Sequence, residues 1–387
     1  MRIRRQVFWP AMLLSGCAFS WAPAFDEVVD PSTVETVAIA APEEALTFAR
    51  FATAEGVRVM LVSKYADGVV EGIDLGKTLG AVITDPIAAF RAHGYDSLSG
   101  LGATAAPETR VSVAAKDLLI PTDLAGGHIA AGTNYPEHAD DAGVDDGPFL
   151  FAKLVTPTAP YATVDAGDGL LDYEVELAWV TLEPMPEGEA PRYMGVMLCN
   201  DYTDRETLFR HADPYDIASG KGFTTGKSFP GFLPVGNLFV IPRDFRAFAD
   251  GIVLQLSVND RLRQRAPASA MVWDFDEIVK QTWARRERTW AHRGTQVALP
   301  GNSGVIPERT LILAGTPHGT VFDGIRRGQM AAGVLAWLSG GWSKPIASHV
   351  IDAYVGDARS AGIYLQPGDR VTIHADRLGV IRNDIIR

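Results

Sequence analysis

The chain has 387 residues, of which 47% are hydrophobic and 21% are charged. These proportions are those of a globular protein with a large core, and they exclude a chain that is disordered throughout. The formal net charge of −12 repels phosphate backbones, so nucleic acid is not an expected partner. This length predicts one large domain and a smaller one.

The first residues predict export and a lipid anchor. A basic start at residues 1–5 precedes a short apolar run at 7–14, and the tetrad Leu-Ser-Gly-Cys then ends at Cys17. This pattern is typical of a secretory signal, and the run is shorter than the ~20 residues that span a bilayer. The tetrad resembles the bacterial lipobox, whose cysteine is lipidated. We expect residues 1–16 to be a signal peptide and the protein to be a periplasm-facing lipoprotein. A soluble periplasmic or secreted protein, an uncleaved N-terminus and a chance tetrad are the alternatives.

Replacing Cys17 with serine should release the protein from membranes and abolish its fatty-acid labelling. Membrane fractionation and metabolic labelling measure these two results. A wild-type protein that is already soluble and unlabelled would contradict the anchor. Lipidation of Cys17 would leave only Cys199, so no intrachain disulfide is expected.

Composition divides the chain into parts. Residues 17–45 mix proline, alanine, threonine and acids without a period, which predicts a tether. Residues 46–124 alternate strand-like and helical runs and predict a small α+β domain, whereas dense strand patterns over 125–387 predict a mixed, β-rich domain. The expected elements are a strand at 57–62, a helix at 87–93, strands at 171–180, 238–241 and 252–258, a helix within 270–288, and strands at 311–314 and 370–374.

An acidic strand is the strongest indication of a functional site. Between Leu171 and Trp179, apolar side chains alternate with Asp172, Glu174 and Glu176, so the three acids share one strand face. Three such carboxylates repel one another unless a cation lies between them. A hard divalent cation bound by oxygen atoms would relieve that repulsion. The plainer alternative is an edge strand whose acids face water.

Four further segments carry groups suited to catalysis or binding. A histidine and a carboxylate one helical turn apart could act as a general base. An arginine could hold a substrate carboxylate, and a lysine in a turn could stabilise enolate charge. Each segment also has a purely structural explanation. The histidine segment could be an acidic surface loop, the arginine segment a capped helix start, the lysine segment an exposed loop, and the fourth segment an ordinary turn. The segments are Asn134–Asp141 with His138, Cys199–Arg205, Gly226–Pro230 with Lys227, and Ala314–Gly319.

The order of these segments resembles the fumarylacetoacetate hydrolase family. The chain reads N-Y-P-E-H, D-Y-E-V-E-L, N-D-Y-T-D-R, G-K-S-F, V-N-D-R-L-R-Q, G-T-P and P-G-D-R-V…G-V-I-R-N between Asn134 and Asn383. The family's motifs follow one another in the same order. The resemblance implies an α+β fold, in which a mixed β-roll catalytic domain follows a small α+β domain.

The resemblance also implies roles for individual residues. The implied metal ligands are Glu174, Glu176 and Asp201; the catalytic residues are His138, Asp141 and Lys227; and the substrate-binding residues are Tyr135, Arg205 and Thr316. The implied ion is Mg²⁺, or Mn²⁺ or Ca²⁺ in its place. Three departures stand out: Asp141 replaces the usual glutamate, Ala131 replaces a fourth carboxylate, and Leu208 replaces a glutamine.

The implied function is that of a metal-dependent enzyme acting on a small 2-oxo acid or 1,3-dicarbonyl acid. Hydrolysis of a C–C bond through a metal-stabilised enolate is the first expectation, and the protein is expected to be a homodimer. Decarboxylation, hydration and isomerisation are alternatives within the family, and a non-catalytic binding lipoprotein is the alternative outside enzymes. Membrane contact is expected only through the lipid anchor.

An insert over about 320–362 has no counterpart in the family pattern. Its large apolar residues, among them Leu335, Leu338 and Trp342, are unsuited to water. We expect the insert to pack over the active site or at a subunit contact.

Overall fold

The computed structural model describes residues 25, 27–137 and 147–387. The predicted signal peptide, Cys17, His138 and Asp141 therefore lie outside the described residues.

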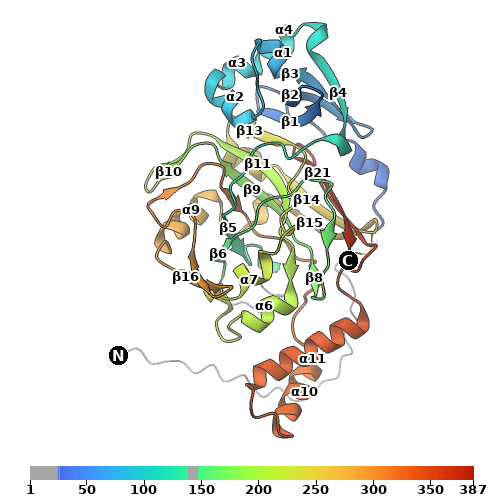
Figure 1. Ribbon diagram of the computed structural model, residues 1–387, viewed down its shortest axis with the longest axis vertical. Coiled ribbons are helices and arrows are strands. Elements are labelled where there is room, and N and C mark those ends of the chain that lie inside the picture. Colours follow the sequence, from blue (N-terminus) through green and yellow to red (C-terminus); the bar gives the residue numbers. More distant parts are fainter. Residues whose placement is uncertain (1–24, 26, 138–146) are drawn as a thin grey trace.

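A ten-stranded sheet runs through the molecule in the order β4-β3-β2-β1-β13-β11-β9-β19-β5-β6 (Figure 1). Its strands are antiparallel except for the parallel pair β19 and β5. The strands are β1 Ala45–Thr53, β2 Gly56–Ala66, β3 Val69–Asp74, β4 Arg110–Ala114, β5 His128–Gly132, β6 Phe149–Lys153, β9 Val175–Thr181, β11 Met194–Asn200, β13 Phe239–Pro242 and β19 Leu311–Leu313.

A second sheet of five strands has the order β15-β14-β20-β21-β7, and three two-stranded ribbons complete the β structure. The five strands are β7 Val164–Asp165, β14 Val253–Val258, β15 Arg261–Pro267, β20 Arg370–Ala375 and β21 Gly379–Ile386. The ribbons pair β8 Leu171–Asp172 with β12 Thr203–Asp204, β10 Met185–Pro186 with β18 Val305–Ile306, and β16 Thr289–His292 with β17 Thr295–Ala298.

Short helices surround the sheets, and two longer ones form a hairpin at one end. The helices are α1 Leu75–Leu79, α2 Pro86–His93, α3 Tyr95–Ser99, α4 Leu101–Thr104, α6 Arg205–His211, α7 Phe223–Lys227, α8 Phe245–Asp250, α9 Phe275–Ala284, α10 Arg327–Leu338 and α11 Ile346–Ala361. The α+β prediction is confirmed, because helices and a largely antiparallel sheet occur together in this arrangement.

The acidic strand is an inner strand, so the reading as a solvated edge strand is wrong. β9 lies between β11 and β19, and every residue of it is buried. The strand predicted over 171–180 is interrupted at Tyr173 and Glu174, which connect β8 to β9. Trp179 on β9 packs edge-on against Phe275 of α9 with ring centroids 5.4 Å apart, which fixes the strand against the core.

The small N-terminal part continues the main sheet. Strand β1 pairs with β13 in the register Ala45 to Pro242 and Phe48 to Phe239. Buried apolar residues of the N-terminal strands and of β9, β11 and β13 form one cluster. A sequence pattern gives no information on such pairing, because the partner strands are far apart in the chain.

The described residues of the segment 17–45, for which a tether was predicted, contact the body from Glu27 onward. The Leu262 amide donates to the Glu27 carbonyl at 2.8 Å, and the Val37 amide donates to the Tyr65 carbonyl at 3.1 Å. Val37 is 2% exposed. These residues lie along the body because their backbone pairs with existing strands and because Val34 and Val37 are buried in the core.

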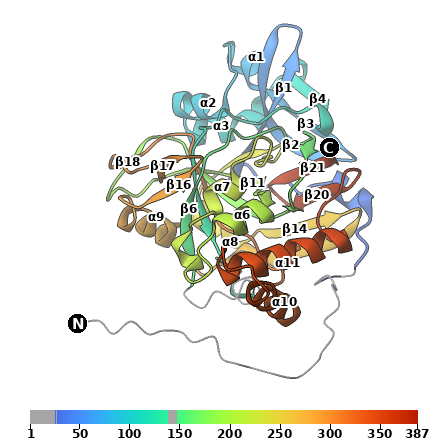
Figure 2. The same cartoon turned by 60° about the horizontal axis from the view of Figure 1, so that its bottom comes forward.

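Helices α10 and α11 form the insert, and they project from one end of the body (Figures 1 and 2). Helix α11 lies against α6, where Arg210 pairs with Asp352 at 2.9 Å and Arg359 pairs with Glu206 at 2.5 Å. The buried Tyr354 of α11 packs edge-on against Phe209, with ring centroids 5.5 Å apart. The inner helix of the insert is therefore fixed to the body beside α6.

A mostly buried carboxylate links α2 to the residues before β19. Asp85 caps α2 by accepting from the Ala88 amide at 3.0 Å, and it accepts from both terminal nitrogens of Arg309 at 3.0 Å each. Burial raises the pKa of Asp85, but hydrogen bonds from Arg309 and from backbone amides outweigh it and lower the pKa to about 2.

Replacing Asp85 with asparagine should lower the free energy of unfolding by about 1–3 kcal/mol at pH 7. Because the folded pKa lies below the unfolded one, this stabilisation is complete above pH ~4 and is lost as the pH falls toward 2. Urea unfolding of both proteins over this range measures the difference. Asp123→Asn, which alters a 65% exposed partner of Arg50, is the control and should change stability by less than ~1 kcal/mol.

Candidate metal centre and active site

Three buried carboxylates converge where β9 begins and β11 ends. Glu176 lies on β9 and Glu174 just before it. The pairing of Cys199 with Glu176, and the hydrogen bond that the Asp201 amide donates to the Glu174 carbonyl at 2.9 Å, bring Asp201 beside them. One oxygen from each of these carboxylates lies within 4.8 Å of the others. Their exposures are 4%, 1% and 0% for Glu174, Glu176 and Asp201.

Two buried lysines contact this cluster. Lys227, at the end of α7, donates from Nζ to Glu174 Oε2 at 2.6 Å and to Asp201 Oδ2 at 2.9 Å. Lys153, at the end of β6, forms an ion pair with Asp201 and donates to the Lys227 carbonyl at 2.6 Å. Burial acts to lower the pKa of both lysines. In Lys153 burial prevails, and the pKa is lower than usual. In Lys227 the charges of Asp201 and Glu174 outweigh burial, and the pKa is higher than usual.

Glu176 lacks an ion pair with any described residue. Its Oε2 accepts the Gly315 amide at 2.8 Å. Burial, and then the charges of Asp201 and Glu174, raise the pKa of Glu176 well above its usual value. Among the residues that the structure describes here, Glu174 and Asp201 thus contact cationic side chains, whereas Glu176 receives only a backbone amide.

The cluster fits a hard divalent cation. Ligand oxygens about 2.1 Å from an octahedral ion lie roughly 3.0 to 4.2 Å from one another. One oxygen from each carboxylate lies within 4.8 Å of the others, which is close to this spacing. Oxygen donors of this kind suit Mg²⁺, Mn²⁺ or Ca²⁺ rather than softer metals.

Arg205, the first residue of α6, holds two of the acids in place. Its Nε donates to Asp172 Oδ2 and its Nη2 donates to Glu174 Oε1, both at 2.8 Å. Asp172 Oδ1 also accepts the Val321 amide at 3.0 Å, and the Phe322 ring centroid lies 5.8 Å from the guanidinium carbon. Arg205 is 4% exposed. These contacts position Glu174, and the start of the insert contacts the same wall of the site.

The Gly-Thr-Pro turn is connected to β9 by a glutamine. Gly315 has φ 89°, and a Cβ there would lie 2.8 Å from Asn134 Cβ, so glycine is required at this position. The buried Thr316 accepts from Gln264 Nε2 at 2.9 Å, and Gln264 Oε1 accepts the Val175 amide at 3.0 Å. The glutamine motif therefore has a structural role in joining the turn to the acidic strand.

Tyr135 presents an unsatisfied hydroxyl near the acids. Asn134 fixes its backbone by donating to the Ala314 carbonyl at 2.7 Å. The Tyr135 hydroxyl is buried and has no hydrogen-bond partner among the described residues. Burial, and then the charge of Glu176, raise its pKa. A buried donor without a partner is what a ligand-binding position would leave available.

The predicted site residues that the structure describes therefore lie around one acidic cluster. His138 and Asp141 lie outside the described residues, so the general-base pair stays a prediction. Sequence reasoning missed Lys153. The available signal was a lysine that directly follows the apolar run Phe149–Ala152, where a charged residue would be buried and would need a partner.

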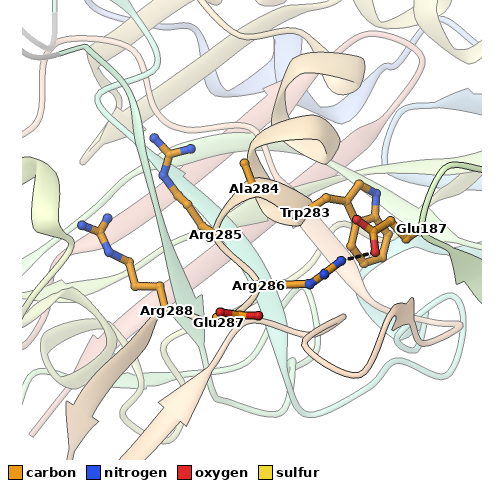
Figure 3. Close-up of a pocket in the computed structure, with 7 residues that line it drawn as sticks. All are labelled: Glu187, Trp283, Ala284, Arg285, Arg286, Glu287 and Arg288. Atoms are coloured by element: carbon orange, nitrogen blue, oxygen red, sulfur yellow. Dashed lines mark hydrogen bonds and ion pairs between the residues drawn. The ribbon is translucent and has the colours of Figure 1, made fainter.

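The cavity drawn in Figure 3 lies away from this cluster. Its volume is about 440 Å³, and it is lined by Glu187 and residues 283–288 at the end of α9. Arg286 pairs with Glu187, whereas Arg285 and Arg288 point away from that pair. This cavity is lined by arginines and glutamates and contains none of the residues of the acidic cluster. We therefore do not treat it as a second candidate active site.

Comparisons with known proteins agree with the order of the motifs. The family described as "Fumarylacetoacetate (FAA) hydrolase C-terminal" matches residues 127–386. An uncharacterized protein of Staphylococcus saprophyticus is 24% identical over 279 residues, which cover 70% of this chain and 71% of that protein.

Two solved structures share the fold. A fumarylacetoacetate hydrolase from Exiguobacterium antarcticum has a TM-score of 0.56 and 18% identity, and the match covers 88% of this chain and 99% of that one. A 2-hydroxyhepta-2,4-diene-1,7-dioate isomerase from Mycobacterium marinum has a TM-score of 0.52 and 19% identity, covering 88% and 98%. With the family match over most of the chain, the protein belongs to the fumarylacetoacetate hydrolase family.

Proposed function

We propose that the protein is a divalent-metal-dependent enzyme that hydrolyses a C–C bond of a small 2-oxo acid or 1,3-dicarbonyl acid. The observation that carries this proposal is the buried convergence of Glu174, Glu176 and Asp201. Lysines and an arginine contact Glu174 and Asp201, but the buried Glu176 lies beside these two carboxylates without a cationic partner among the described residues, which is unfavourable unless a cation binds there.

The bound cation would act as a Lewis acid toward the oxygens of the substrate. Lys227 and Arg205 orient Glu174, and Lys153 and Lys227 orient Asp201, so the ligand oxygens are held before a metal arrives. The Tyr135 hydroxyl, which is buried without a partner among the described residues, would donate to a substrate oxygen.

The remaining assignments extend this proposal. His138, oriented by Asp141, would take a proton from water. Thr316 would contact the substrate. Arg205 would also do so through a guanidinium nitrogen that its carboxylate partners leave available. We also propose that the protein is exported as a periplasm-facing lipoprotein and that it assembles as a homodimer.

Isomerisation is the second candidate reaction, because one structure of the same fold is named an isomerase. A metal-supplemented screen of acylpyruvates, oxaloacetate and 2-oxo-enoic acids separates the reactions. Hydrolysis gives two acids, decarboxylation gives CO₂, and hydration or isomerisation changes the ultraviolet absorbance of the enoic acid. A non-catalytic binding protein would show a thermal shift with one of these acids but no product. No product with any of them, at any of the three metals, would contradict the proposed enzyme.

A further inference from the structure

The outer helix of the insert exposes an apolar surface. The chain carries no charged residue from Gly328 to Ser343. Five large apolar side chains are exposed within thirteen residues here, whereas elsewhere in the described chain such side chains are exposed singly. The five are Val334 at 40%, Leu335 at 65%, Leu338 at 58%, Trp342 at 70% and Ile346 at 38% exposed.

The opposite face of α10 is the one that packs on the protein. A Cβ at Gly333 would lie 2.5 Å from Val350 Cγ2, so glycine allows α11 to approach closely. Gln329 on the same face donates to Asp357 at 3.1 Å. Leu335 and Leu338 lie on the outer face, so folding of this chain leaves them in water.

We propose that the outer face of α10, together with the loop to Trp342, inserts into the surface of a lipid bilayer. Arg327 is exposed at the start of α10. Lys344, which follows Trp342 closely, is 59% exposed and lies 3.7 Å from Asp352, and the whole chain is acidic. Cations at both ends of an apolar stretch suit anionic headgroups, and tryptophans are typical of membrane interfaces.

The dimensions of α10 favour lying in the interface over crossing it. The helix has 12 residues, against the ~20 that span a bilayer. No helix in the described parts of the chain is long and apolar enough to cross a membrane. A short helix that carries its apolar residues outward would lie parallel to the membrane plane.

A second copy of the chain fits this surface less well. A helix of this length is ~18 Å long and ~10 Å wide, so its outer face offers roughly 200 Å², whereas a stable interface buries ~800 Å² per partner. A membrane contact can be stable with a smaller area if a lipid anchor on the same chain contributes to the membrane affinity.

The start of the described chain lies near the base of the hairpin. The Phe25 ring packs against His318 with centroids 5.3 Å apart, shortly before the chain leaves for α10. The predicted lipidation site, Cys17, precedes Phe25 by eight residues, which can reach at most ~28 Å. Anchor and hairpin would thus approach the membrane from the same end, although the sequence alone predicted contact through the anchor only.

The test uses the full chain and vesicles of phosphatidylethanolamine and phosphatidylglycerol, some with brominated acyl chains. Bromine should quench the fluorescence of wild type, and Trp342→Phe should lower that quenching by the share that Trp342 contributes; Trp337 of α10 and Trp21 near the N-terminus stay in both proteins. Leu335→Glu with Leu338→Glu should lower quenching and vesicle partition at least ~10-fold, because two exposed leucines lose their apolar contact. Val82→Glu with Tyr215→Glu, also at exposed apolar positions, is the matched control and should behave as wild type.

Quenching at Trp342 reports on the hairpin itself, whatever holds the N-terminus. Circular dichroism and melting establish that each variant folds, and Trp342→Ser provides a second single-site variant. Equal quenching in wild type and the Leu335/Leu338 variant would overturn the proposal. So would a lipid-free dimer of wild type that this variant converts to monomer, because the occupant would then be a second copy.

Discussion

Replacing Glu176 with glutamine is expected to abolish activity and to remove the stabilisation of the protein by Mg²⁺ or Mn²⁺. The amide has nearly the same shape but no charge, so a divalent ion loses one of three anionic ligands. Wild type should gain about 2.7 kcal/mol of stability when the free ion is a hundredfold above its Kd. Calorimetry with and without metal measures this difference.

The same substitution should have the opposite effect without metal. Glu176 lacks an ion pair with any described residue and lies close to Glu174 and Asp201, so removing its charge relieves repulsion. Metal-free Glu176→Gln should therefore be at least as stable as wild type. Glu189→Gln, at an exposed glutamate, is the control and should keep both activity and the metal response. An unchanged metal response in Glu176→Gln would rule out the metal centre.

Replacing Arg205 with methionine is expected to destabilise the protein by about 3–5 kcal/mol. Methionine fills a similar volume but leaves Asp172 and Glu174 buried without their guanidinium partner. Burial lowers the pKa of Arg205, but the two carboxylates outweigh it and raise the pKa, so the arginine stays charged. Urea unfolding of the metal-free protein measures the loss.

Arg210→Met is the matched control on the same helix. Arg210 pairs with Glu206 and Asp352 while 41% exposed, so its loss should change stability by less than ~1 kcal/mol. Adding Asp172→Asn to Arg205→Met should restore part of the stability, because one unpaired charge is removed. Equal effects of the two arginine substitutions would show that the buried network does not hold the site.

A substrate role for Arg205 can be tested separately from its structural role. Arg205→Lys keeps the charge but cannot donate to both carboxylates in the same geometry. If Arg205 also holds a substrate carboxylate, this variant should raise KM more than it lowers kcat at saturating metal. A change in the metal response alone would indicate that Arg205 acts only by positioning Glu174.

Local sequence patterns determined the acidic strand and the chemistry it could support. Period-two alternation predicted Glu174 and Glu176 on one side of the chain, and their oxygens do converge, although β9 begins only at Val175. The order of the motifs also predicted the family and the α+β fold, because each motif is a short segment that can be recognised along the chain without knowledge of its contacts. Helix α9 was likewise predicted from its own segment of the sequence.

Tertiary structure decided what surrounds those residues. The burial of β9 between β11 and β19, and the pairing of β1 with β13, join segments far apart in the sequence, so no local period encodes them. The same holds for Lys153, whose partner Asp201 is 48 residues away, and for Arg205, whose donors are directed at Asp172 and Glu174. The insert shows the remaining difference: its sequence predicted an apolar segment that needs cover, but only packing against α11 determines which face stays exposed.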